Sequence, residues 1–470
     1  MFIPLGVAFL MKEFNPFWDF LISLSFTGVV GFILIILFPF EKDMSSTQAF
    51  IAVSLSWVLA SLFGAIPLWL SGHFLSFLDA VFEAMSGFAT TGLSLMQDID
   101  HASFSVHVWR HLMMFLGGQG IVIIALSFLI KASGTALGLY IGEARDEKIL
   151  PNIIDTARFI WAVSFVYLIV GVCALTVFNL NAGLGLVKSL LHGFMLFMAA
   201  FDTGGFTPQS MSILYYHSFA IEITTVVLMI LGSLNFNLHY CLWMRRKKEL
   251  FKNIETRIFF ISFTILFSLL NVFVLLASRV GVFRFVREGF YQLISAHSGC
   301  GFTNLYSGAL NSWSDGALLM LILAMAFGGG VCSTTGGIKL MRLGLMFKGA
   351  VLEIKEKIFP QKAVFVEKYH HISSLSIDDK KIRGVFFIFL MYLVSYLAGA
   401  IIGVFCGYNF LPALFESTSA AANVGLSLGI TSSSMPMLLK ITYIIQMWTG
   451  RLEFVAVIVS FGFVFTLFKK

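Results

Sequence analysis

Four short segments, far apart in the 470-residue chain, share a glycine that is followed by a large apolar residue and then by a hydroxyl. The aligned segments are FEAMSGFATTGLS (82–94), MLFMAAFDTGGFT (195–207), YQLISAHSGCGFT (291–303) and FESTSAAANVGLS (415–427), with the glycine at Gly92, Gly205, Gly301 and Gly425. A lone glycine in an apolar helix usually serves close helix packing. Four aligned copies favour a repeated functional loop.

Such loops could bind a cation through their backbone carbonyl groups. Glycine adopts backbone angles that are closed to other residues and adds no side chain, so carbonyl groups beside it can approach a common axis. Rings of backbone carbonyls replace the hydration shell of a cation in selectivity filters. The candidate oxygen donors around the four glycines are Thr90, Thr91, Thr203, Gly204, Gly299, Cys300, Asn423 and Val424. Glu83 and Glu416, each nine residues before its glycine, either contact the ion or hydrogen-bond to the backbone behind the filter.

The rest of the chain has the composition of a membrane protein. It is 58% hydrophobic and 12% charged, with a mean hydropathy of +0.90, whereas soluble domains carry about 25% charged residues. Five runs are nearly free of charge and long enough to cross about 30 Å of hydrocarbon as helices. They span 17–40, 49–70, 159–180, 258–277 and 385–406. The sequence therefore predicts an all-α membrane protein.

Each glycine motif occupies the same place in a larger unit. A spanning helix precedes a shorter, half-apolar helix that ends at the motif, and a second spanning helix follows, expected over 107–131 in the first unit. Non-helical backbone at membrane depth is tolerated only where protein covers it or where it lines a water-filled path. Four helix/pore-loop/helix repeats around a pseudo-fourfold central pore are therefore expected. The expected divisions are 1–46 (N-terminal helix pair, shortened), 47–131 (repeat 1), 132–157 (linker), 158–244 (repeat 2), 245–256 (loop), 257–348 (repeat 3), 349–382 (linker) and 383–470 (repeat 4).

The distribution of charge predicts the orientation. Most of the 31 Lys and Arg residues gather in the connections near 131–158, 245–257 and 339–383 and at the C-terminus. Positive loops stay cytoplasmic, so both termini are expected in the cytoplasm, and the basic patches orient the protein rather than bind nucleic acid. No Cys-x-x-Cys spacing or His-Glu-x-x-His motif occurs, and no Ser/His or Cys/His arrangement appears at a spacing usable for catalysis. We therefore expect neither enzymatic activity nor a cofactor.

The motifs resemble the Trk/Ktr/HKT superfamily of potassium transporters, and most closely its prokaryotic Trk-type membrane subunit. Besides the four glycine segments, the resemblance includes GGGVCSTTGGIKLMR (328–342) and MWTGRLE (447–453). It implies an intramembrane gating loop in the third repeat and an arginine barrier at Arg451. The implied gate residues are Gly328, Gly329, Gly330, Ser333, Thr334, Thr335, Gly336, Gly337 and Lys339. A phosphate-binding loop is not indicated, because a Walker motif requires Lys-Ser/Thr directly after its last glycine. Close helix packing remains the alternative.

The resemblance implies potassium uptake across the cytoplasmic (inner) membrane of a prokaryote, in contact with membrane lipid, with potassium as the substrate. A sodium-conducting or cation-coupled relative on the same fold is the alternative, and glycine in all four motifs is the pattern that the family associates with potassium. Asp202-Thr203-Gly204-Gly205 and Gly299-Cys300-Gly301 depart from the common Asn-Ala-Gly and Thr-Thr-Gly. The implied partners are a second copy of the chain and a cytosolic, nucleotide-binding regulatory ring (TrkA-like), expected to dock near 245–257 and 348–383.

Overall fold

The computed structural model describes residues 1–38, 44–121, 123, 126, 134–144, 149, 152–277, 282–306, 308–359 and 367–467. Within these residues, five helices are long and apolar enough to cross a membrane, and counting two sharply bent helix pairs as spans raises the number to seven. The five are α2 (Phe14–Leu37), α3 (Ser46–Leu70), α8 (Ile153–Asn181), α13 (Ile254–Ala277) and α17 (Asp379–Phe405). The prediction of an all-α membrane protein is confirmed.

A shorter helix leads into each glycine segment. These helices are α4 (Phe77–Phe88), α9 (Leu186–Phe201), α14 (Val282–His297) and α18 (Phe410–Ala421). Each packs against the long helix before it, from α3 with α4 to α17 with α18. The Ser76 hydroxyl fixes the start of α4 by accepting the Asp79 N–H at 3.2 Å, which satisfies one of the unpaired amides of the first turn.

The second span of every repeat is interrupted at mid-length. In the first repeat, α5 (Phe104–Gln119) ends at the break, and α7 (Gly134–Gly142) lies in the connection that follows. The parts in the other repeats are α10 (Phe219–Ser233) with α11 (Phe236–Trp243), α15 (Asp315–Ala326) with α16 (Leu340–Ile358), and α19 (Met437–Arg451) with α20 (Val455–Leu467). The α10/α11 and α19/α20 pairs bend by 103° and 108°. The predicted continuous helix over 107–131 is wrong at Gly120, whose φ of +100° ends α5. Lys131 lies outside the described residues.

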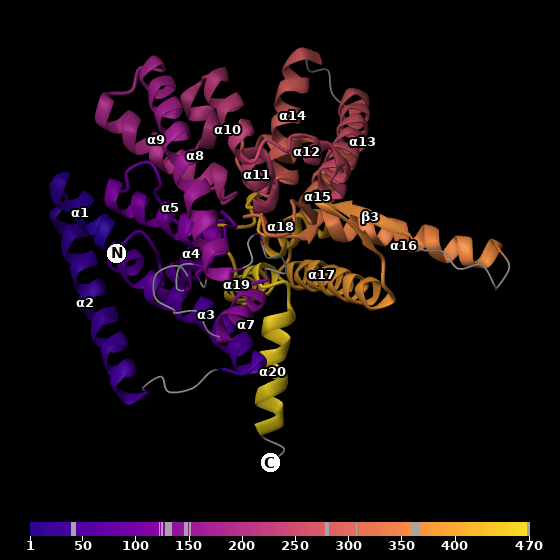
Figure 1. Cartoon of the computed structure of the whole chain (residues 1–470). Helices are drawn as coiled ribbons and strands as arrows, with labels where there is room; N and C mark the ends of the chain where they lie inside the picture. Colours follow the sequence, from indigo (N-terminus) through magenta and orange to yellow (C-terminus); the bar gives the residue numbers. More distant parts are fainter. Residues whose placement is uncertain are drawn as a thin grey trace.

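The repeats close into a circle. The second span of each repeat packs against the short helix of the next: α5 on α9, α10 on α14, α15 on α18, and α19 back on α4. A buried ion pair stabilises the contact between α19 and α4, where Lys440 Nζ lies 2.6 Å from Asp79 Oδ1. Trp448 Nε1 also donates to the Ser54 carbonyl on α3 at 3.2 Å. Figure 1 shows the four sets of helices meeting at the centre of the molecule.

An additional helix pair precedes the first repeat at the edge of the molecule (Figure 1). It consists of α1 (Phe2–Leu10) and α2, joined by a turn at Lys12 with a φ of +58°. The carboxylate of Glu13 accepts the N–H groups of Phe104 at 2.8 Å and Ser105 at 3.0 Å. Because these amides begin α5, the pair is anchored by capping a helix of the first repeat.

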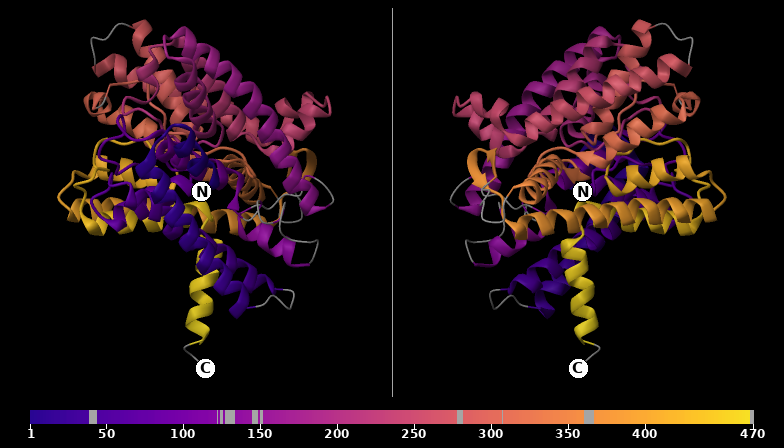
Figure 2. Two further views of the ribbon diagram at one scale, coloured as in Figure 1. Left: turned by 90° about the vertical axis from the view of Figure 1, so that its left-hand side faces the viewer. Right: turned by 90° about the vertical axis from the view of Figure 1, so that its right-hand side faces the viewer.

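Two elements extend away from the central body. Helix α20 projects from it beside α3 (Figure 2), and α16 projects outward past β3 (Figure 1). An antiparallel hairpin of β3 (Lys368–His371) and β4 (Ser373–Ser376) lies beside α16 and the short helix α12 (Lys248–Lys252). Lys355 hydrogen-bonds to Glu367 at the base of this hairpin and thereby lowers the pKa of the Glu367 carboxyl.

Candidate functional site

The four short helices end in the same backbone motif. Two residues before each glycine the backbone is left-handed, and the next N–H reaches back to the carbonyl five residues earlier, which is a Schellman cap. In α4, Thr90 has a φ of +52° and Thr91 N donates to Ser86 O at 2.8 Å. The equivalent left-handed residues are Thr203 (+51°), Gly299 (+73°) and Asn423 (+55°). The cap stops the helix and turns all four segments in the same way.

Alternating backbone angles then orient the carbonyl groups. The four glycines also have positive φ, and the residue between each left-handed position and its glycine does not. Such alternation directs successive amides to one side and carbonyls to the other. The glycine amides point back to the short helices, as in the bond from Gly92 N to Ser86 Oγ at 3.1 Å. Within the described residues, no hydrogen bond ends on the carbonyl oxygen that precedes each glycine, namely that of Thr91, Gly204, Cys300 and Val424.

The four glycine segments contact one another in a closed ring. A Cβ placed on Gly92 would lie 2.4 Å from Gly204 O, and one on Gly205 would lie 2.2 Å from Cys300 O. The series continues from Gly301 to Val424 O at 2.0 Å and from Gly425 to Thr91 O at 2.1 Å. Each carbonyl oxygen therefore occupies the space that a side chain on the neighbouring segment would need. Together with the positive φ, this requires glycine at all four places.

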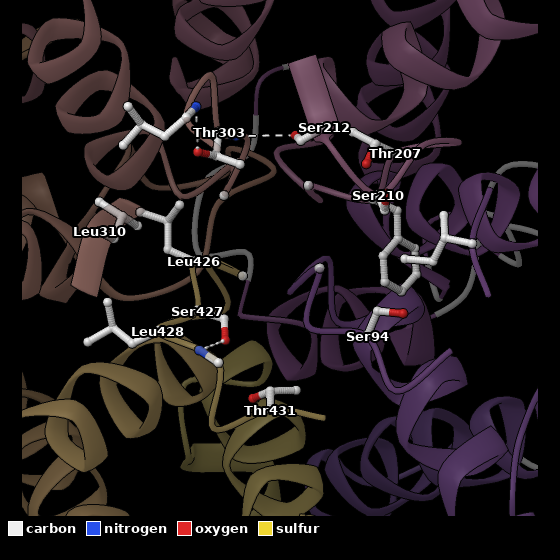
Figure 3. Close-up of a pocket in the computed structure, with 18 of the residues that line it drawn as sticks. Ser94, Thr207, Ser210, Ser212, Thr303, Leu310, Leu426, Ser427, Leu428 and Thr431 are labelled. Carbon is white, nitrogen blue, oxygen red and sulfur yellow. Dashed lines mark hydrogen bonds between the residues drawn. The ribbon is translucent and has the colours of Figure 1, made fainter. Parts of the chain in front are cut away.

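One side of this ring opens into a vestibule of about 450 Å³ that all four glycines line. Hydroxyl groups of Ser94, Thr207, Thr303 and Ser427 surround it (Figure 3). Arg110 also lines the vestibule, but its guanidinium is 1% exposed and binds Glu83 Oε1 through Nε at 2.8 Å. The positive charge at this entrance is therefore offset by a carboxylate.

The two candidate glutamates lie behind the glycine segments. Glu416 accepts the N–H of Leu428 at 2.8 Å and the hydroxyl of Thr431 at 2.6 Å. Glu83 accepts Leu95 N at 2.9 Å in the first repeat. Of the two alternatives from the sequence, the described hydrogen bonds match backbone support. Asp202, at the end of α9, likewise receives a hydrogen bond from Gln119 Nε2 at 2.7 Å.

On the other side of the ring, the glycine-rich segment 329–337 forms a loop. A short parallel pair between β1 (Phe327–Gly328) and β2 (Ile338–Lys339) closes its neck. The neck requires glycine, since a Cβ on Gly328 would lie 1.8 Å from Gly336 O and Gly337 has a φ of +71°. The segment is not a continuous helix face, because the helix is interrupted here.

The tip of this loop contacts the glycine segments. Thr334 Oγ1 lies 3.1 Å from Thr203 Oγ1, and Thr90 Oγ1 lies 3.4 Å from Thr334 O. Thr90 and Thr203 are β-branched residues in the left-handed region, a costly conformation that clusters at functional sites. Both of these residues therefore meet the loop directly beneath the ring.

Backbone bonds to the second repeat hold the loop in place. Gly330 N donates to Ser233 O at 2.8 Å and Thr334 N donates to Gly232 O at 3.3 Å, at the break between α10 and α11. Lys339, which is 5% exposed, folds back and donates to Thr335 O at 2.5 Å. Ser333 hydrogen-bonds to Gly330 O at 2.6 Å. The loop is thus ordered by contacts within it and from a neighbouring repeat.

Arg451 completes the closure from the fourth repeat. Its Nη1 donates to Thr334 O at 2.6 Å and its Nη2 donates to Gly117 O at 2.6 Å. Below these groups a cavity of about 20 Å³ remains, lined among others by Ser333, Lys339 and Arg451. That volume holds about one water molecule.

The structure brings together the residues that the sequence selected for the loops, with some additions. The glycines, the carbonyl donors, the 328–339 segment and Arg451 lie within one continuous set of contacts. Sequence reasoning missed Glu255, whose Oε1 accepts Val331 N at 2.7 Å, and Gly117 beside Arg451. Their signal is weak because Glu255 is 76 residues from Val331 in the sequence and Gly117 belongs to a different repeat from Arg451. The described residues contain no cluster of three or more His, Cys, Asp or Glu side chains that could hold a metal ion.

These features define a class of protein: a polytopic helical membrane protein with four short helices that lead into loops meeting at one axis. The chain belongs to the TrkH family of cation transport proteins, whose family model matches residues 19–465. An uncharacterized cation transporter of Methanocaldococcus jannaschii is 32% identical over 468 residues, covering 100% of this chain and 92% of the relative. The Trk system potassium uptake protein TrkG of Escherichia coli is 27% identical, covering 98% and 94%.

Two further relatives extend the comparison. The Trk system potassium uptake protein TrkH of Halomonas elongata is 30% identical over 433 residues, covering 90% of this chain and 86% of the relative. The crystal structure of the potassium transporter TrkH from Vibrio parahaemolyticus superposes with a TM-score of 0.80 at 23% identity, covering 97% of this chain and 94% of that one. This likeness supports the overall fold described above.

Proposed function

We propose that this protein takes up potassium ions across the cytoplasmic membrane of a prokaryote through a selectivity filter formed by the four glycine segments. The observation that supports this proposal is the closed ring of contacts between each glycine and a carbonyl group of the next segment. Carbonyl oxygens that receive no hydrogen bond from the described residues are available to replace water around a cation. The relatives named as potassium uptake proteins support potassium as the transported ion.

In this proposal the filter donors are the backbone oxygens of the residues selected from the sequence, Thr90, Thr91, Thr203, Gly204, Gly299, Cys300, Asn423 and Val424. The ends of the four preceding helices point toward the same region and add the negative end of the helix dipole. The chain acts as a transporter without a cofactor and without enzymatic activity, and potassium is its substrate.

The loop 329–337 and Arg451 are proposed to form the gate. They lie on one side of the ring and obstruct the path without contributing a side chain to the vestibule. The guanidinium adds a positive charge to the path of a cation. Displacement of the loop would open the path while the ring stays intact.

The proposed orientation has the vestibule outside the cell and the loop toward the cytoplasm, with both termini cytoplasmic. The exposed basic residues Arg245, Arg246, Lys247 and Lys248 lie on the connection after α11, on the loop side. Positive connections face the cytoplasm. Lys42, Arg145, Lys148, Lys362, Lys469 and Lys470, which contributed to the predicted orientation, lie outside the described residues.

A homodimer is proposed from the exposed apolar side chains of α16. Phe347, Val351, Ile354 and Ile358 recur at intervals of four, three and four residues, and are 63%, 48%, 57% and 72% exposed. This spacing forms one apolar stripe, which is typical of a helix that pairs with another helix. The same helix of a second copy is a self-complementary partner for it. A cytosolic nucleotide-binding ring is proposed to dock on the basic surfaces near 245–257 and 348–383.

The experiment is cation uptake by the purified protein in liposomes. Rubidium or potassium should enter much faster than sodium, with or without an imposed proton gradient. A sodium-conducting or cation-coupled transporter on the same fold is the alternative. Preferential sodium entry, or uptake that requires a gradient of a second cation, would favour that alternative.

A further inference from the structure

A buried carboxylate at the start of α13 binds the loop 329–337. Glu255 is 3% exposed, and its Oε1 accepts the N–H of Val331 at 2.7 Å. Its Oε2 accepts Asn235 Nδ2 at 3.4 Å, at the break between α10 and α11. A Cβ on Gly330 would lie 2.8 Å from Glu255 Oε2. The missing side chain at Gly330 therefore makes room for this carboxylate against the loop backbone.

Asn253, which contacts the hairpin, fixes the position of Glu255. Asn253 Oδ1 accepts Glu255 N at 2.8 Å and so caps the start of α13. The Asn253 amide donates to His371 Nδ1 at 3.2 Å, and His371 belongs to β3. A continuous series of hydrogen bonds thus runs from the hairpin through Asn253 and Glu255 to Val331.

The hairpin also contacts α16, the helix that follows the loop. Lys348 Nζ, on α16, donates to Lys368 O at 2.7 Å, and α16 begins directly after Lys339 at the neck of the loop. His370 Nε2 lies 2.7 Å from Glu249 on α12. The hairpin is therefore connected to the loop in two ways. It contacts α16, which continues the chain from the loop, and it contacts Asn253, which positions Glu255.

We propose that Glu255 is a positioning residue of the gate, whose carboxylate holds Val331 and keeps the loop closed, and that Asn253 and His371 connect it to the hairpin 367–376. This inference rests on the proposed role of the loop as the gate. A hydrogen bond to a charged acceptor contributes more to stability than one to a neutral acceptor. A buried N–H group that is left without an acceptor costs free energy. Loss of the carboxylate should therefore shift the closed loop toward open arrangements.

The test uses the full chain in liposomes and two separate readouts. The first is rubidium uptake, and the second is the alkylation rate of Cys332, which is 3% exposed in the loop and quantified by mass spectrometry of its peptide. Glu255→Ala should raise both rates by about tenfold, with the potassium preference retained. Glu255→Gln should have a smaller effect because its amide oxygen can still accept Val331 N. Glu13→Ala is the matched control, since that carboxylate also accepts backbone amides, but far from the loop.

The outcomes separate this inference from the proposed function. Unchanged Cys332 alkylation in folded Glu255→Ala and Glu255→Gln overturns the role of Glu255. Raised alkylation with unchanged rubidium uptake supports that role and overturns the loop as the gate. If Glu255→Ala does not fold, Glu255→Gln and Asn253→Ala decide the question with the same readouts.

The connection to the hairpin is tested by a double-mutant cycle. His371→Ala and Asn253→Ala should each raise Cys332 alkylation, and the double variant should not exceed the larger single effect, because both remove one link. Additive effects, or no effect of His371→Ala, would overturn the connection between the hairpin and Glu255.

Discussion

The guanidinium of Arg451 and the carbonyl of Thr334 are joined by a 2.6 Å hydrogen bond, although they belong to different repeats. The same guanidinium binds Gly117 O in the first repeat at 2.6 Å. A planar group with five donors can bridge several carbonyls at fixed angles. Arg451 therefore joins groups of three repeats at the tip of the loop 329–337, and its removal is the most direct way to loosen these contacts.

Replacement of Arg451 by Ala should increase rubidium uptake by about tenfold, because hydrogen bonds from a charged group are lost. Replacing part of residues 330–337 should also increase rubidium uptake. Sodium uptake, measured in the same liposomes, should stay low because the glycine ring is untouched. Arg158→Ala is the control, as Arg158 is an exposed residue with only a 3.8 Å pair to Asp155. Selectivity lost along with the increase would identify the loop as part of the filter.

A serine at Gly92 or Gly425 should reduce the discrimination of potassium over sodium by about tenfold, which corresponds to about 1.4 kcal/mol. The added Cβ would lie 2.4 Å from Gly204 O or 2.1 Å from Thr91 O and must displace a filter carbonyl. The measurement is the ratio of rubidium to sodium flux. Gly185→Ser should leave that ratio unchanged, because nothing lies within 4 Å of its Cβ. Unaltered ratios in variants at all four filter glycines would refute the filter assignment.

Removing one member of the Asp79–Lys440 pair should destabilise the protein by about 3 kcal/mol, since a buried charge is left without its partner. The variants are Asp79→Asn and Lys440→Met, and the measurement is thermal unfolding in detergent. The double variant should recover part of the loss. For comparison, Lys357→Met should change little, because its pair with Glu353 is exposed. Equal effects at both pairs would mean that burial does not decide their contribution.

Charge on the apolar stripe of α16 should prevent association of two copies. Phe347→Asp and Ile354→Asp place a carboxylate in the proposed helix pair, where desolvation opposes it. The mass of the particle in detergent should fall to that of one 52.2 kDa chain plus bound detergent. Glu356→Lys reverses a charge on the opposite face of α16 and should leave the mass unchanged. A dimer that survives both stripe variants would exclude this helix as the contact.

The glycine segments could be predicted from sequence because one short pattern recurs four times. Each copy also forms a local backbone motif, with a left-handed residue two positions before its glycine, so the turn does not depend on distant residues. The role of the Thr90 hydroxyl could not be predicted, since its contact to Thr334 joins positions 244 residues apart. The same holds for Glu255, which is separated from Val331 by 76 residues. The end of α5 at Gly120 was missed because the segment Gly117-Gly118-Gln119-Gly120 carries no charge and lies within an otherwise apolar run.

The contact between α19 and α4 has a consequence for synthesis of the protein. Asp79 emerges from the ribosome 361 residues before Lys440. At about 5 to 20 residues per second, the first repeat waits roughly 20 to 70 seconds for the partner of its buried carboxylate. During that interval the fourth glycine segment is missing, so the carbonyl group of Thr91 does not yet have Gly425 beside it. A ribosome stalled before residue 425 would therefore hold three repeats around an open side, and the ring of glycine segments closes only when translation is nearly complete.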